Sequence, residues 1–155
     1  MAIRRSAGLL VHRMTDDAGL QMLLGHMGGP LWARKDAGAW SVPKGEYTEE
    51  EAPLDAAVRE FTEELGAPPP PGPYTSLGEI RQSGGKHVTV WAVGGDFDPA
   101  ALRPGTFTME WPPRSGRRQE FPELDRVGWF APEEARGKLV KAQGAFVDRL
   151  LEHLG

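Results

Sequence analysis

The chain of 155 residues is long enough to bury a hydrophobic core, and its 39% hydrophobic and 26% charged residues are ordinary for a globular protein. The absence of cysteine excludes disulfides, thiolate catalysis and cysteine-based metal centres. The formal net charge of −4 and the pI near 5.6 argue against general nucleic-acid binding. We expect one domain over residues 1–155.

Apolar runs in this chain are short. None approaches the roughly 18 residues that cross a bilayer, so we expect no membrane partner. The N-terminal run, residues 7–11, is also shorter than the roughly 7–15 residues of a secretory signal. We therefore expect a cytoplasmic protein, and the sequence leaves its oligomeric state open.

The first elements are predicted from apolar runs. Residues 6–12 and 20–24 are apolar and joined by the polar TDDAG, which predicts a hairpin. A brief extended run follows at residues 40–42. Residues 53–65 are predicted to form a helix with Pro53 in its first turn and Gly66 at a left-handed cap. Its apolar stripe must face a core and consists of Leu54, Ala57, Val58, Phe61 and Leu65.

Breakers and strands follow this helix. The run PPPPGP at residues 68–73 excludes a helix or an inner strand. Residues 74–82 and 86–93 predict two strands. Residues 95–125 are rich in Pro, Gly and charged residues, and we expect a long irregular connection there.

The C-terminal part predicts one strand and two helices. Residues 126–130 read as a strand, and a helix begins at Pro132. The apolar stripe of a final helix consists of Phe146, Val147, Leu150, Leu151 and Leu154. Strands interleaved with helices predict an α/β or α+β layered domain.

Acidic residues gather on one segment. Residues 44–64 hold eight acids and two bases. Glu60, Glu63 and Glu64 are spaced i, i+3, i+4, which places them together on the helix side opposite the apolar stripe. Their repulsion would favour a bound divalent cation, and oxygen ligands on a rigid helix suit Mg²⁺ or Mn²⁺. A solvated acidic face, or a calcium-binding helix of structural role, would carry the same three acids.

The spacing around these acids forms a longer pattern. Its specified positions are Gly45, Glu51, Arg59, Glu60, Phe61, Glu63, Glu64, Gly66 and Ala67. Here the sequence resembles the Nudix hydrolases, whose signature is G-x5-E-x7-R-E-U-x-E-E-x-G-U, with U apolar. The resemblance implies a Nudix-like α/β/α sandwich with a mixed β-sheet. A structural calcium helix would not need Gly45, Arg59 and Gly66.

The resemblance also implies roles. Nudix enzymes cleave a nucleoside diphosphate linked to another moiety, by metal-dependent attack of water at phosphorus. The metal-ligand carboxylates would be Glu60, Glu63 and Glu64, joined by the backbone carbonyl of Gly45. Arg59 and Glu51 would brace the loop against the helix. The general base lies in the box or on a later loop, where Glu120 and Glu123 are the candidates; we favour Glu123 from its spacing to Trp129.

Substrate-binding candidates are cationic or aromatic. Arginine forks suit phosphate oxygens, lysine supplies a point charge, and tryptophan can stack on a base. Packed tryptophans and solvated cations are the alternative interpretation. The candidates are Lys35, Lys44, Lys86, Trp111, Arg114 and Arg117.

Within the family the layout is most similar to the diadenosine-tetraphosphate hydrolases. The shared features are AGLLVHR, WSVPKG before the box, and Lys86 leading into an apolar strand with a tryptophan. This implies a small-molecule substrate, a dinucleoside polyphosphate or a related nucleotide. An oxidised dNTP, ADP-ribose or an inositol pyrophosphate would use the same box. A non-catalytic Nudix sensor would be expected to lose a box glutamate, and all are present.

Overall fold

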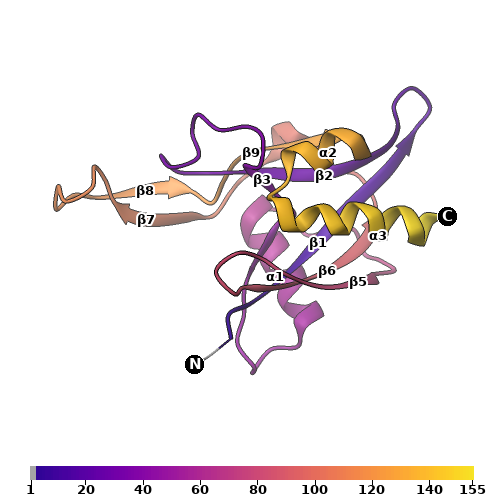
Figure 1. The fold of residues 1–155 in the computed structure, drawn as a ribbon, viewed down its shortest axis with the longest axis horizontal. Helices are drawn as coiled ribbons and strands as arrows, with labels where there is room; N and C mark the ends of the chain where they lie inside the picture. Colours follow the sequence, from indigo (N-terminus) through magenta and orange to yellow (C-terminus); the bar gives the residue numbers. More distant parts are fainter. Residues whose placement is uncertain (1–2) are drawn as a thin grey trace.

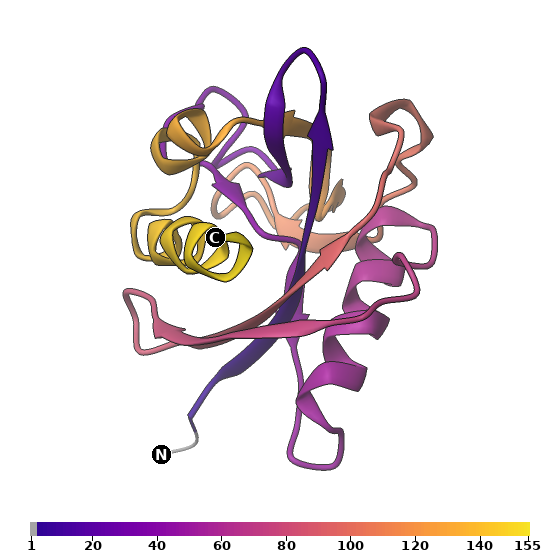
Figure 2. The ribbon, with the colours of Figure 1, turned by 90° about the vertical axis from the view of Figure 1, so that its right-hand side faces the viewer.

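A twisted mixed sheet lies between one helix on one face and two helices on the other (Figures 1 and 2). The computed structural model describes residues 3–155. The strands are β1 (Arg5–Thr15), β2 (Gly19–Met27), β3 (Trp40–Ser41), β4 (Lys44–Glu46), β5 (Thr75–Arg81), β6 (His87–Gly94), β7 (Thr106–Glu110), β8 (Arg118–Pro122) and β9 (Leu124–Phe130). The helices are α1 (Pro53–Leu65), α2 (Pro132–Lys138) and α3 (Gly144–Leu154), with short 3₁₀ turns η1 (Pro99–Ala101) and η2 (Lys141–Gln143). The predicted layered α/β/α fold with a mixed sheet is confirmed.

The sheet runs in the order β3-β2-β1-β6-β5, and β9 pairs with the other edge of β2. β1 and β6 are parallel, whereas the other pairs are antiparallel. The predicted hairpin of β1 and β2 is confirmed. Its ladder joins His12 to Met22 and would, if continued, place Ala7 opposite Met27. Ala7 pairs with Gly45 of β4 instead, so β1 and β2 diverge at this end.

The wedge between β1 and β2 is filled by residues 40–46. β3 pairs with β2 through Ser41 and Gly25, and β4 pairs with β1. The chain crosses from one strand to the other at Val42 and Pro43, and the Leu9 N–H donates to the Pro43 carbonyl at 3.2 Å. The divergence of two strands therefore creates the place where the functional site lies.

Two apolar clusters cover the two faces of the sheet. β1 contributes to both, because its side chains alternate: Leu9 faces α1 and Leu10 faces α3. α1 buries Ala56, Ala57, Phe61 and Leu65, which includes most of the predicted stripe. α3 buries Phe146, Val147 and Leu150 as predicted. Both faces of the sheet are thus packed against helices.

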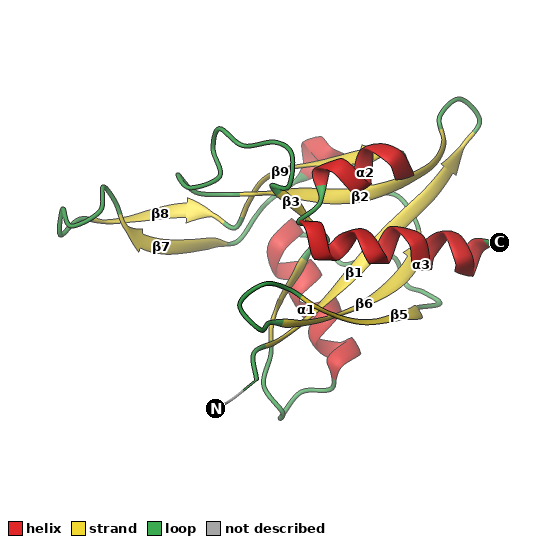
Figure 3. Cartoon of the chain, in the orientation of Figure 1, coloured by secondary structure: helices red, strands yellow, loops and turns green. Residues whose placement is uncertain are grey.

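The prediction of an irregular connection over residues 95–125 was wrong for part of that segment. β7 and β8 form a two-stranded hairpin that projects from the body of the molecule (Figure 3). The Glu110 carboxylate closes its tip by accepting from the Arg114 N–H at 3.0 Å and the Gly116 N–H at 3.2 Å. Partly exposed strands flanked by Pro and Gly lack the apolar runs that mark buried strands, which explains the error.

Within residues 3–155, no helix has the length and apolar character needed to cross a bilayer.

The end of β2 approaches the segment between β8 and β9 with no room for a side chain. The Gly28 N–H donates to the Glu123 carbonyl at 3.0 Å. A Cβ on residue 28 would lie 1.9 Å from the Pro122 carbonyl oxygen. Glycine at this position is therefore required for the close approach of two backbones.

We predict that Gly28→Ala destabilises the protein by about 1–3 kcal/mol, because the backbone at Pro122 must move to admit the methyl group. Urea unfolding measures the change. The matched control is Gly137→Ala in α2, where a Cβ meets no atom within 4 Å and helix propensity favours alanine. Equal stability of the two variants would contradict the prediction.

Candidate active site

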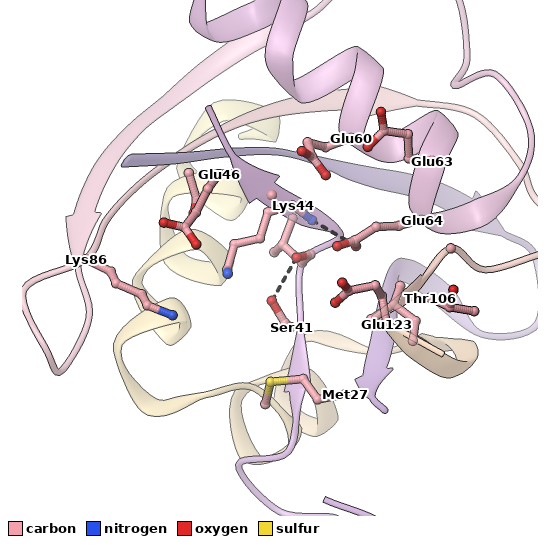
Figure 4. A pocket seen from close by; sticks show the side chains of 15 residues that line it. Met27, Ser41, Lys44, Glu46, Glu60, Glu63, Glu64, Lys86, Thr106 and Glu123 are labelled. Carbon is pink, nitrogen blue, oxygen red and sulfur yellow. Dashed lines mark hydrogen bonds between the residues drawn. The ribbon is translucent and has the colours of Figure 1, made fainter. Parts of the chain in front are cut away.

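A cavity of about 470 Å³ opens at the divergence of β1 and β2, between the C-terminal half of α1, β4 and the segment that joins β8 to β9. Five carboxylates line it, those of Glu46, Glu60, Glu63, Glu64 and Glu123 (Figure 4). Lys44 and Lys86 enter from β4 and the β5–β6 turn. The cavity is therefore acidic along α1, and away from this helix it combines the two lysines with Glu46 and Glu123.

Helix α1 begins and ends where the sequence predicted. Pro53 occupies the first turn, and Gly66 ends the helix in the left-handed region with φ of 78°. The Gly66 N–H donates to the Thr62 carbonyl at 2.8 Å. Burial of the opposite stripe against the sheet fixes the rotation of the helix, so the glutamates face the cavity.

Arg59 connects the acidic loop to the helix. Its Nε and Nη2 each donate to a Glu51 carboxylate oxygen at 2.8 Å, a bidentate pair. Its Nη1 donates to Glu60 at 2.8 Å and to Glu63 at 3.3 Å. One guanidinium thus offsets the repulsion between two neighbouring carboxylates and holds the preceding loop.

Glu60 lies directly against the backbone of β4. A Cβ on Gly45 would lie 1.9 Å from Glu60 Oε2. The carboxylate and the peptide group of residue 45 can be this close only because residue 45 has no side chain.

Glu64 is held at the same strand, where its Oε2 accepts from the Lys44 N–H at 3.2 Å. Burial raises the pKa of Glu64 to about 8, although the Lys44 ammonium opposes that shift. Burial also raises the pKa of Glu60, against the effect of Arg59, and that of Glu123. The pKa of Lys44 is lowered, chiefly by burial. Such shifts, gathered in a cleft, are typical of functional sites.

A chain of backbone hydrogen bonds positions Glu123 across from α1. The Gly105 N–H donates to the Glu63 carbonyl at 3.0 Å, and the Glu123 N–H donates to the Gly105 carbonyl at 2.8 Å. The Glu123 carbonyl in turn accepts from Gly28. Glu123 is therefore fixed relative to the glutamates of α1, whereas Glu120 is exposed on β8 and does not line the cavity.

Several predicted substrate-binding residues lie elsewhere. The Lys35 ammonium lies 5.3 Å from the centre of the Trp32 ring, and neither residue lines the cavity. Trp111, Arg114 and Arg117 lie at the tip of the β7–β8 hairpin, also outside the cavity lining. Ser41 and Thr106 also line the cavity, although they were not predicted from the sequence. No sequence motif marks these two residues. They reach the cavity only because of where β3 and β7 pair in the fold.

The donor set fits a hard divalent cation. Within the described residues 3–155, no three His, Asp or Glu side chains are already gathered closely enough to coordinate one ion. Glu60 and Glu63 instead share the Arg59 guanidinium, and Glu64 is held by the Lys44 N–H. All three line one cavity beside the backbone of Gly45, and oxygen-only ligands of this kind suit Mg²⁺ or Mn²⁺.

Comparison with known proteins gives one family. A family model described as the NUDIX domain matches residues 2–150. Comparison with curated proteins gave no match.

Several solved structures share the fold. An Ap4A hydrolase of C. elegans, crystallised as a binary complex, has a TM-score of 0.65 at 20% identity over 98% of each chain. The NUDIX domain of NrtR from Shewanella oneidensis, complexed with ADP ribose, has a TM-score of 0.66 at 14% identity over 100% of this chain and 90% of that one. A mutT/nudix family protein from Listeria innocua has a TM-score of 0.64 at 17% identity over 99% and 95%.

We predict that Glu64→Gln stabilises the metal-free protein increasingly as the pH rises from about 4.5 to about 8. The folded wild type keeps a proton on Glu64 that the unfolded chain releases in this range, so its stability falls with pH while that of the variant does not. Thermal unfolding in EDTA measures the difference, with roughly 2–4 °C in Tm for each kcal/mol. A Tm difference independent of pH would contradict it.

Proposed function

The chain belongs to the Nudix family, a family of pyrophosphohydrolases, and we propose that its substrate is a dinucleoside polyphosphate or a related nucleotide. The observation that carries this proposal is the division of the cavity. Carboxylates of α1 line one side, and Lys44 and Lys86 enter from the other, where the nearby Glu46 is paired with Arg4. A substrate with several consecutive phosphates would meet both.

We propose Glu60, Glu63 and Glu64 as the metal ligands, with the Gly45 carbonyl beside them. Nudix hydrolases generally need divalent ions, and the donor set favours Mg²⁺ or Mn²⁺ here. When bound, such ions neutralise charge on the pyrophosphate oxygens and lower the pKa of the attacking water. Arg59 would then hold its Glu51 partner and steer Glu63, four residues along the helix.

Glu123 is the proposed general base. Its carboxylate faces the cavity from the side opposite α1, and its backbone is fixed by two hydrogen bonds. Burial raises its pKa, which makes it a stronger base than an ordinary glutamate. In the step we propose, the water oxygen bonds to phosphorus, the bridging P–O bond breaks, and the water proton passes to Glu123. The leaving phosphate takes the electron pair of the broken bond.

Lys44 and Lys86 are the proposed phosphate contacts. Within residues 3–155, neither ammonium has a carboxylate within ion-pair distance. Glu46, which lines the same region, is engaged by Arg4 at 2.9 Å. The lysines therefore have charge to offer to phosphates that extend away from α1.

The other substrate contacts predicted from the sequence remain proposals. Lys35 and the hairpin residues Trp111, Arg114 and Arg117 would contact substrate only if its distal nucleoside extended beyond the cavity. The expected cytoplasmic location stays a prediction.

The substrate proposal is tested by a panel of dinucleoside polyphosphates, ADP-ribose, NADH, oxidised dNTPs and inositol pyrophosphates with Mg²⁺ or Mn²⁺ and product identification. We expect dinucleoside polyphosphates to be hydrolysed best. Lys86→Ala should raise their KM about 10–100-fold, the cost of a charged hydrogen bond. Lys141→Ala, an exposed lysine outside the cavity, should leave KM unchanged.

Two outcomes would overturn parts of this proposal. Preferred turnover of ADP-ribose or another panel member would replace the substrate, and no metal-dependent turnover at all would remove the enzyme assignment. Full metal-dependent activity of Glu64→Gln, a folded variant by its thermal unfolding, would remove the proposed ligand set.

For the general base, we predict that Glu123→Gln lowers kcat by about 10²–10⁴, the usual contribution of general-base catalysis. The neighbouring variant Glu120→Gln should retain wild-type kcat, because Glu120 lies outside the cavity lining. Steady-state kinetics on the preferred substrate measures both. A loss confined to Glu120→Gln would reverse the assignment.

A further inference from the structure

Gln143 is a fully buried amide that lies outside the cavity and uses both of its polar atoms. Its Oε1 accepts from the Val42 N–H at 2.9 Å. Its Nε2 donates to Ser41 Oγ at 3.0 Å and to Gln82 Oε1 at 2.7 Å. Its side chain is 0% exposed. A polar side chain so buried and so completely paired is costly to replace, because the buried Val42 N–H would be left without a hydrogen bond.

The first of these partners belongs to the crossover between β3 and β4. Ser41 still pairs with β2, and Lys44 already pairs with β1. Val42 lies between the two ladders, is fully buried, and has its N–H directed to Gln143 in place of a strand partner. Gln143 thus accepts a hydrogen bond from a backbone N–H that pairs with neither strand. This N–H belongs to Val42, two residues before Lys44 and three before Gly45.

The second partner belongs to the β5–β6 turn. Gln82 closes this turn, since its N–H donates to the Lys86 carbonyl at 2.8 Å. Its side-chain oxygen accepts from Gln143. The turn that carries Lys86 is therefore tied to the same buried amide as the crossover that carries Lys44.

We propose that Gln143 is a positioning residue that sets the two lysines of the cavity, and the Gly45 backbone, relative to one another. The segments 41–45 and 82–86 come from different parts of the sheet, and the side chain of Gln143 bonds to both. η2 is held in turn by the Val140 N–H, which donates to the Trp40 carbonyl at 2.9 Å, and by packing of α3 on the sheet. The kinetic part of this inference rests on the proposed function.

The test compares Gln143→Met, similar in length but unable to hydrogen-bond in this way, with Leu150→Val. Leu150 is buried on α3 and touches neither segment by hydrogen bonds, so its variant reports lost packing alone. We expect Gln143→Met to speed amide hydrogen exchange about tenfold in both 41–45 and 82–86 relative to Leu150→Val. We expect KM for the preferred substrate to rise about fivefold or more, while Leu150→Val keeps wild-type KM.

A second comparison tests whether Gln82 affects substrate binding through the position of Lys86. Gln82→Ala cuts only the link to the Lys86 turn, so it should raise KM about fivefold in the wild type and have no further effect in a Lys86→Ala background. Additive effects of the two substitutions would show that Gln82 does not act through Lys86 and would overturn the proposal.

The positioning role of Gln143 and the proposed function can be refuted independently of each other. Unchanged exchange in 41–45 and 82–86 in Gln143→Met would overturn the positioning role whatever the activity. If the wild type hydrolyses no panel member, the proposed function fails, and the exchange measurement still decides whether Gln143 orders both segments.

Discussion

The site depends on the ion pairs that one guanidinium, that of Arg59, makes with three carboxylates. Arg59 pairs with Glu51 in the loop and with Glu60 and Glu63 on the helix, so it offsets the repulsion between the loop carboxylate and those in the C-terminal half of α1. Its charge does not reach Glu64, which is held by a backbone N–H and carries a pKa raised to about 8. In the metal-free protein this carboxyl therefore keeps its proton near neutral pH, and a bound cation would favour its charged form.

Burial of a carboxyl group is unfavourable for folding, and packing elsewhere in the molecule offsets that cost. Burial of Phe61 and Leu65 on the opposite side of α1 fixes the helix against the sheet, so Glu60 and Glu64 stay directed toward the cavity. The C-terminal end of α1 is tied further, because Gly105 and Arg103 donate to the Glu63 and Leu65 carbonyls. Local strain at a functional site is tolerated when its surroundings over-determine it.

The sequence predicted what depends on local periodicity and composition. The bounds of α1 follow from Pro53, Gly66 and the apolar spacing, and the bidentate pair of Arg59 with Glu51 was expected from the motif. The β7–β8 hairpin was missed because its strands are short and partly exposed. Ser41, Thr106 and the buried Gln143 were missed for another reason: their positions depend on contacts between residues far apart in the chain. Spacing along the chain carries no information on such contacts.

Close backbone approaches explain why the site sits where two strands part. At Gly45 the missing side chain admits the Glu60 carboxylate, and at Gly28 it admits the Pro122 carbonyl. Both glycines flank the wedge between β1 and β2, one on the strand that fills it and one at its open end. A continuous β1–β2 ladder would place Ala7 opposite Met27 and close this space. The interrupted ladder instead leaves backbone groups beside a cavity, and buried backbone groups must find partners. Gln143 and the Gly28–Glu123 hydrogen bond supply them, so the contacts that satisfy the broken sheet are the same contacts that place the lysines and the proposed base.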